Sequence, residues 1–198
     1  MFVNKSHISS LRFLIPLLGL FFYSCANRTS GPSGGPKDTT PPRLVKSTPQ
    51  NGQTNYNKTK IDLEFDELVS LEKQAQKISV SPTQKTPPTI TASGKSIHVT
   101  LNDSLLPNTT YTIDFADAIV DNNEGNKLPD FSFAFSTGKE LDSLQISGTV
   151  IDAYTHNPVS NVIVGIYSSL NNNEFITSPP LRITKTNEKG HFILRNIK

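Results

Sequence analysis

The sequence is poor in the residues from which catalytic and metal sites are most often built. Its 198 residues contain one cysteine, one methionine, four histidines and no tryptophan. One cysteine cannot form an intramolecular disulfide, so the fold must depend on the burial of apolar side chains. The sequence also lacks a Cys/His cluster with metal-ligand spacing, a glycine-rich phosphate loop and a local nucleophile–base pair. We therefore predict that the protein is not an enzyme and has no catalytic residues, bound metal or cofactor.

The apolar run at residues 13–22 is too short to cross a membrane, because a transmembrane helix needs about 20 apolar residues. Lys5 and Arg12 precede this run, and the small Ser24 lies directly before Cys25. This order is typical of a secretory signal, here residues 1–24. The sequence FYSC, which ends at Cys25, resembles a bacterial lipobox. The resemblance implies that Cys25 is lipidated, with acyl chains such as palmitate, and becomes the first mature residue. The alternative is an ordinary cleaved signal beside an incidental cysteine.

No surplus of charge remains once the predicted signal is removed. The whole chain has 19 Lys and Arg against 17 Asp and Glu. Two of the bases and none of the acids lie within residues 1–24, so 17 of each sign remain. A chain without a basic surplus is not typical of nucleic-acid-binding proteins. We predict no nucleic-acid partner, and contact with the membrane through the lipid anchor.

Residues 26–42, with the sequence ANRTSGPSGGPKDTTPP, show no apolar periodicity and consist mostly of Gly, Pro, Ser and Thr. Such a segment buries too little apolar surface to offset the entropy lost on ordering. We therefore predict that residues 25–42 are the lipidated cysteine followed by a flexible tether.

Alternation of apolar and polar residues dominates residues 43–139. A period of two predicts strands with one buried and one wet face, and Asn, Gly and Pro turns separate the runs. This pattern predicts an all-β sandwich, with at most a short helical turn within residues 71–78. The inward phase of the strands predicts a core of Leu63, Phe65, Val99, Leu101, Tyr111, Ile113, Phe133 and Phe135.

Residues 144–198 show the same alternation over shorter runs. Ile146 and Gly148 alternate with polar residues, as do Val162, Val164 and Ile166. Turns are predicted around residues 156–158, 171–174 and 187–190. We predict a second antiparallel β domain, near the lower size limit for independent folding.

Residues 40–138 resemble the SbsA-type bacterial Ig-like domain. The resemblance rests on IDLEFDELV from Ile61, LPNTTYTI from Leu106, the turn at residues 121–126, and FSFAFSTG from Phe131. The family often has proline where Leu68 stands in this chain. The resemblance implies an Ig-like β-sandwich and no enzymatic activity.

Residues 144–198 resemble the start of a carboxypeptidase-regulatory-like domain, a transthyretin-like sandwich. The resemblance rests on ISGTVID from Ile146, on Pro158-Val159 and on GHFIL from Gly190. The family pattern continues into further strands, so we expect the second β-sandwich to be incomplete. Either the chain is a fragment of a longer reading frame, or a partner supplies the missing strand.

The combination of these two segments with the lead-in GGPKDTTPP resembles envelope lipoproteins of the Bacteroidota. That resemblance implies a lipid-anchored protein of the cell outer membrane. It does not decide between the periplasmic and the surface-facing side of that membrane. It also suggests O-glycosylation at Thr39, Ser104 and Ser143, each of which follows an aspartate in a predicted tether, turn or linker.

Several polar groups are candidates for sites. His98, His156 and His191 have no acid nearby in sequence to orient them, so we predict solvated histidines. The acids of residues 62–67 are expected to form the wet face of a strand. Residues 121–126 faintly resemble a calcium loop, but the glycine is one place early and no twelfth-position glutamate follows, so a plain Asn/Gly turn is favoured.

These observations predict a lipid-anchored structural or adhesive binding module without catalysis. The alternative is an accessory lipoprotein that binds carbohydrate or peptide for an envelope enzyme or an uptake system. An envelope protein or a glycan is the expected kind of partner.

Overall fold

The computed structural model describes residues 35–171 and 173–198. The predicted signal, Cys25 and residues 26–34 of the predicted tether lie outside the described residues. Within the described residues, Asp38–Lys198 form one compact unit. Within the described residues, no helix is long and apolar enough to span a membrane.

One sheet has four antiparallel strands in the order β1-β2-β6-β5. The strands are β1 (Leu44–Thr48), β2 (Lys60–Phe65), β5 (Thr89–Ser93) and β6 (Ser96–Thr100). In β2, buried and exposed side chains alternate along the whole strand, as the period of two predicts. The β5–β6 hairpin turns at Gly94, whose φ of 61° lies in the region that glycine adopts without steric cost.

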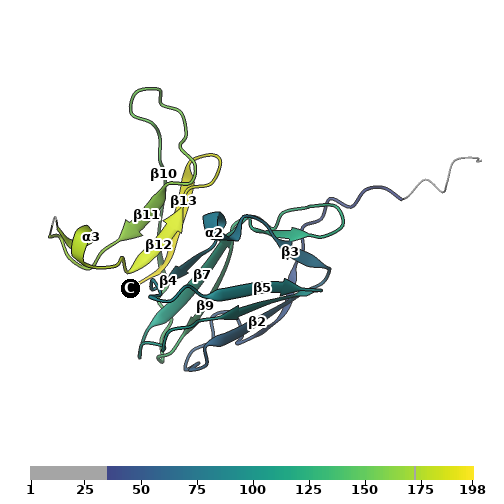
Figure 1. Cartoon of the computed structure of the whole chain (residues 1–198), viewed down its shortest axis with the longest axis horizontal. Coiled ribbons are helices and arrows are strands. Elements are labelled where there is room, and N and C mark those ends of the chain that lie inside the picture. Colours follow the sequence, from purple (N-terminus) through teal and green to yellow (C-terminus); the bar gives the residue numbers. More distant parts are fainter. Residues whose placement is uncertain (1–34, 172) are drawn as a thin grey trace, which may run out of the picture. The chain divides into compact units, whose positions relative to one another are not determined.

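The facing sheet has the order β4-β7-β9, built from β4 (Ser79–Ser81), β7 (Thr110–Ala116) and β9 (Phe131–Ser136). A smaller pair joins β3 (Val69–Leu71) to β8 (Ile119–Asp121). A single helical turn, α2 (Gln74–Lys77), connects β3 to β4 and confirms the helical turn predicted within residues 71–78. Figure 1 shows the strands of the two larger sheets as separate layers.

The core lies between these sheets and is the predicted one. All eight side chains assigned to it from the strand phase are at most 1% exposed. The ring of Tyr111 stacks on that of Phe135 at 5.3 Å, and Tyr56 meets Phe135 edge-on at 5.4 Å. Aromatic pairs in these geometries add to the stabilisation from burial alone. The all-β sandwich predicted from alternation is therefore confirmed.

The C-terminal part consists of two antiparallel pairs. One joins β10 (Leu144–Thr149) to β13 (His191–Ile197), and the other joins β11 (Ile163–Ile166) to β12 (Arg182–Lys185). A short helix, α3 (Glu174–Thr177), precedes β12. Leu194 is the one large apolar side chain in the described part of this region that is buried.

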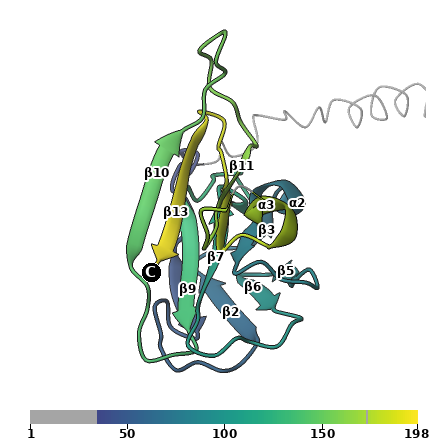
Figure 2. The same cartoon turned by 90° about the vertical axis from the view of Figure 1, so that its left-hand side faces the viewer.

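The C-terminal strands lie against the outer face of β4 and β7 (Figures 1 and 2). This corrects the prediction of a wet face on the strand at residues 110–116, because Thr112 is only 6% exposed. This face of β4 and β7 is polar, and the C-terminal strands are joined to it by hydrogen bonds that involve side chains and not by backbone strand pairing. The hydrogen bonds run from Ile183 N to Ser81 Oγ (2.9 Å), from Thr184 Oγ1 to Asp114 Oδ2 (2.8 Å) and from Thr112 Oγ1 to Asn196 Oδ1 (2.9 Å).

The folded unit begins before the predicted boundary at residue 43. Pro42 is buried, and Asn126 Nδ2 donates a hydrogen bond to Asp38 O at 3.0 Å. Residues 38–42, which composition assigns to the tether, are thus part of the folded unit. Gly and Pro content describes the average behaviour of a segment, and it does not reveal contacts with a loop almost 90 residues away.

Candidate functional site

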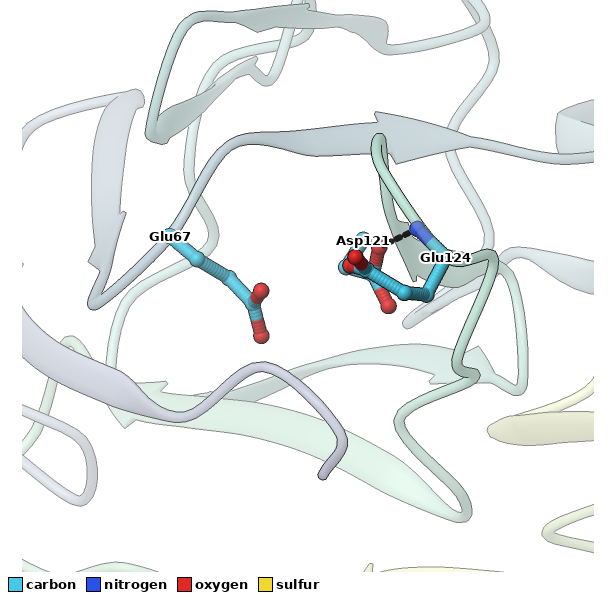
Figure 3. Close-up of side chains that lie close together, drawn as sticks. All are labelled: Glu67, Asp121 and Glu124. Atoms are coloured by element: carbon cyan, nitrogen blue, oxygen red, sulfur yellow. Dashed lines mark hydrogen bonds between the residues drawn. The ribbon is translucent and has the colours of Figure 1, made fainter. Parts of the chain in front are cut away.

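Three carboxylates meet where the β2–β3 connection approaches the end of β8 (Figure 3). Glu67 precedes β3, Asp121 ends β8, and Glu124 lies in the following turn. One carboxylate oxygen from each lies within 4.8 Å of the others. The antiparallel pairing of Val69 with Asp121 brings the β2–β3 connection next to the end of β8. Asn122 N donates a hydrogen bond to Leu68 O at 2.9 Å and extends this pairing by one bond. Among the described residues, this is the single place where three His, Cys, Asp or Glu side chains lie close enough to share a metal ion.

Asp121 organises the turn at residues 121–126. Its Oδ1 accepts hydrogen bonds from the backbone N–H groups of Asn123 (2.9 Å), Glu124 (2.6 Å) and Gly125 (3.1 Å), and Oδ2 accepts one from Asn126 (2.7 Å). Burial acts to raise the pKa of Asp121, but these bonds outweigh it and lower the pKa below the ordinary value. The side chain is therefore a fixed negative charge in an Asn/Gly turn of the predicted kind.

The pKa of Glu67 is shifted in the opposite direction from that of Asp121. Burial, followed by repulsion from Asp121, Asp66 and other nearby acids, raises the pKa of Glu67. A cation would relieve this repulsion, but calcium takes about six to eight oxygen ligands. Three carboxylates have six oxygens, but the two of Asp121 already accept four N–H groups, which leaves fewer than calcium takes. The cluster has the composition of a weak cation site and the hydrogen bonding of a structural turn.

The other acids of residues 62–67 do not join this cluster. Asp66 pairs with Arg43 at 3.0 Å, and Asp62 Oδ1 lies 2.6 Å from His98 Nδ1. His98 has no acid nearby in sequence, as predicted, but Asp62, 36 positions earlier in the chain, lies beside it. The β2–β6 register places Asp62 directly opposite His98, which sequence separation could not show. Both side chains are about half-exposed, so the pair is a solvated cross-strand contact.

The other predicted site residues are separate from one another. His156 is exposed in a turn, and His191 is half-buried at the start of β13. Thr39, Ser104 and Ser143 are all exposed, as an acceptor of a modification must be, and their glycosylation stays a prediction.

A second candidate site is an apolar groove of about 580 Å³, which we call the lateral groove. One wall comes from α2, β4, the loop at residues 83–88 and the start of β5, and the other comes from β11 and β12. The lining side chains include Ile78, Gln84, Ile90, Ile163, Ile183 and Lys185. Sequence reasoning missed this groove because its two walls lie about 100 residues apart in the chain.

The family comparison concerns the N-terminal sandwich. A family model described as a bacterial Ig-like domain matches residues 38–137. A search of curated proteins found no match. The chain is similar to the solved structure of PcoC, a methionine-rich copper resistance protein from Escherichia coli. The identity is 21% and the TM-score is 0.36, over 48% of this chain and 96% of that chain.

Two further solved structures are similar at lower identity. The N-terminal part of the bacterial S-layer protein SbsC is 14% identical with a TM-score of 0.32, over 79% of this chain and 44% of that chain. An L,D-transpeptidase from Mycobacterium smegmatis is 11% identical with a TM-score of 0.32, over 74% of this chain and 77% of that chain. Likenesses of this size say nothing about function.

Proposed function

The chain belongs to the bacterial Ig-like domain family, and from this premise we propose that it is a structural or adhesive binding module anchored to the cell envelope by a lipid on Cys25. Domains of this family are generally non-catalytic. Their sandwich is a scaffold whose function depends on what its surface contacts.

The observation that carries the binding role is the lateral groove, which the Ig-like sandwich and the C-terminal strands build together. Its volume falls within the range of about 300–1,000 Å³ typical of ligand sites. It is lined mainly by aliphatic side chains with a few polar groups, the usual composition of a recognition site. The groove also favours the second candidate function, an accessory lipoprotein that binds peptide or carbohydrate for another envelope protein.

The anchoring role rests on the sequence around Cys25. A basic start, a short apolar run and the lipobox-like FYSC support cleavage and lipidation there. Three acyl chains would hold the protein far more firmly than the marginal anchor of a single myristoyl chain. Residues 26–37 precede the folded unit. Fully extended, a segment of this length would reach at most about 40 Å, enough to keep the sandwich clear of a lipid surface.

The anchor is tested by replacing Cys25 and following both lipid and location. In Cys25→Ala we expect loss of radiolabelled palmitate, retention of the uncleaved precursor and loss of the mature form from outer-membrane fractions. Ser24→Ala is the matched control, because it keeps a small residue before the cysteine and should leave all three properties unchanged. Normal maturation and membrane retention of Cys25→Ala would contradict the anchor. Protease added to intact cells then distinguishes the surface-facing from the periplasmic side.

A further inference from the structure

The lateral groove is bordered by a strand that has room for another strand beside it. In the described part of the chain, β11 pairs with β12 and with no second strand. Thr186 N donates to Val162 O and Leu181 N to Ile166 O, so alternate residues of β11 direct their backbone groups toward β12. Ile163 and Gly165 alternate with these residues, so their N–H and C=O groups point away from β12, to the edge of β11 that has no paired strand.

This edge is short, but it lacks charged residues, proline and a bulge, which are common protections against strand addition. The strand has the sequence IVGI, and Ile163 is 61% exposed. Ile163 and Ile183 share the face of the β11–β12 pair that lines the groove. A strand added beside β11 would continue this face, so its alternate side chains would point into the groove toward Ile78 and Ile90.

Charge restricts the occupant further. Lys185, directly opposite Ile163 on β12, is the one charged residue that lines the groove. Its ammonium group donates to Ala75 O at 2.8 Å, and it takes part in none of the ion pairs of the described residues. Burial lowers the pKa of Lys185, so an incoming carboxylate would stabilise its charged form.

We infer that the lateral groove is a docking site for an extended peptide that adds a strand to β11, places aliphatic side chains between Ile78, Ile90 and Ile163, and presents a carboxylate to Lys185. The inference deepens the proposed binding role and rests on it, but it is independent of the lipid anchor. In an antiparallel addition the C-terminal end of the peptide lies beside Ile163, the first residue of β11. The acid should therefore be at the C-terminal end of the bound segment.

Binding is measured with the full 198-residue chain and the fluorescent peptide TVTVTVTD, whose valines and aspartate share one face. We expect saturable binding that weakens at least about tenfold when the amides facing β11 are N-methylated, because the ladder bonds are lost. The isomer TDTVTVTV, with the acid at the other end, should bind about three- to tenfold more weakly. Equal binding of the N-methylated peptide would overturn strand addition.

Substitutions locate the site. Ile163→Lys should weaken binding at least about tenfold, because an edge lysine blocks strand pairing. Ile146→Lys is the matched control, since Ile146 is 51% exposed on β10 and lies outside the groove, and it should leave binding unchanged. Lys185→Gln should weaken TVTVTVTD about three- to tenfold and leave its Asn counterpart unaffected. Thermal unfolding of each variant shows whether it is folded.

Two outcomes would overturn the inference. One is equal loss of binding in Ile163→Lys and Ile146→Lys when both are folded. The other is displacement of the peptide by dodecanoate at concentrations below its micelle-forming range, which would indicate a site for an aliphatic acid. Failure of peptide binding in a protein that still fractionates with membranes refutes the docking site and leaves the anchor intact. Peptide binding by a protein that is not membrane-bound refutes the anchor alone.

Discussion

The Ig-like sandwich and the C-terminal strands are built from the same alternating pattern, yet they are stabilised differently. In the sandwich, twelve large side chains, among them Phe65, Tyr111 and Phe133, are less than 2% exposed. In the described residues after 139, the buried side chains are Leu194 and the polar Arg182, Thr184 and Thr186. The sandwich therefore has its own apolar core, whereas the C-terminal strands bury few apolar side chains and contact β4 and β7 through polar groups. Such a region should open at a lower free energy than the domain on which it rests.

The largest expected effect comes from the sandwich core. Phe133 is fully buried on β9, so Phe133→Ala should lower the free energy of unfolding by about 3–5 kcal/mol. Because the C-terminal strands rest on this sandwich, Phe133→Ala should lower protection in both regions, as measured by denaturant titration with hydrogen exchange. Glu64→Ala, on the exposed face of β2, should change stability by no more than about 0.5 kcal/mol. Equal losses at the two positions would show that burial does not distinguish them.

The next largest loss of stability should come from Arg182 and should be confined to the C-terminal region. Arg182 donates to Asn196 O at 2.7 Å and to Asp142 Oδ2 at 3.2 Å, and its side chain is 10% exposed. Arg182→Ala should destabilise this region by about 1–3 kcal/mol, because partly buried acceptors lose their donor. Hydrogen exchange and limited proteolysis should increase after residue 140 and remain low in residues 43–137.

Arg43→Ala is the matched control for this substitution. Arg43 also pairs with an aspartate, Asp66, but its side chain is 78% exposed. We expect a change of at most about 0.5 kcal/mol and no increase in exchange after residue 140. If Arg182→Ala raised exchange equally across the sandwich, the two regions would form one cooperative unit and the comparison would fail.

The smallest effect is a pH dependence at the contact between the regions. Burial raises the pKa of Asp114, against the hydrogen bonds from Thr184 and Ala116 and the positive charge of Arg195, while Asp130 adds to the rise. A carboxyl whose pKa is higher in the folded state favours folding when protonated, and this contribution is lost as pH rises above the ordinary aspartate range. Asp114→Asn should therefore reduce the loss of C-terminal protection between acidic and neutral pH, as measured by hydrogen exchange.

Asp121 provides the opposite control. Its pKa is lowered in the folded state, so its contribution is present at neutral pH and is lost as pH falls through the folded pKa. Asp121→Asn should thus be destabilising at neutral pH and lose its effect in acid, with the change confined to the turn at residues 121–126. Parallel pH profiles for the two variants would show that the shifts do not have opposite signs.

Particular residues show where sequence reasoning succeeds. Leu63, Val99 and Phe135 are assigned to the core because each strand has one apolar phase, and the phase is a local property of the chain. The turn at residues 121–126 is also predictable, because an aspartate can satisfy the nearby N–H groups of its own turn. The carboxylate cluster is not, because the strand pairing that brings Glu67 to Asp121 depends on a register absent from the local pattern.

By itself, the sequence determined the period of the strands, the composition of the core and the positions of the turns, since each depends on neighbours a few residues apart. Only the tertiary structure decided that the polar face of β7 is covered, that Asp62 meets His98 and that two distant segments enclose the lateral groove. Alternation reveals that a strand has a polar face, but not whether water or another polar surface satisfies it. Hydroxyl, amide and carboxyl groups hydrogen-bond equally well to both, so that choice depends on which strands pack together.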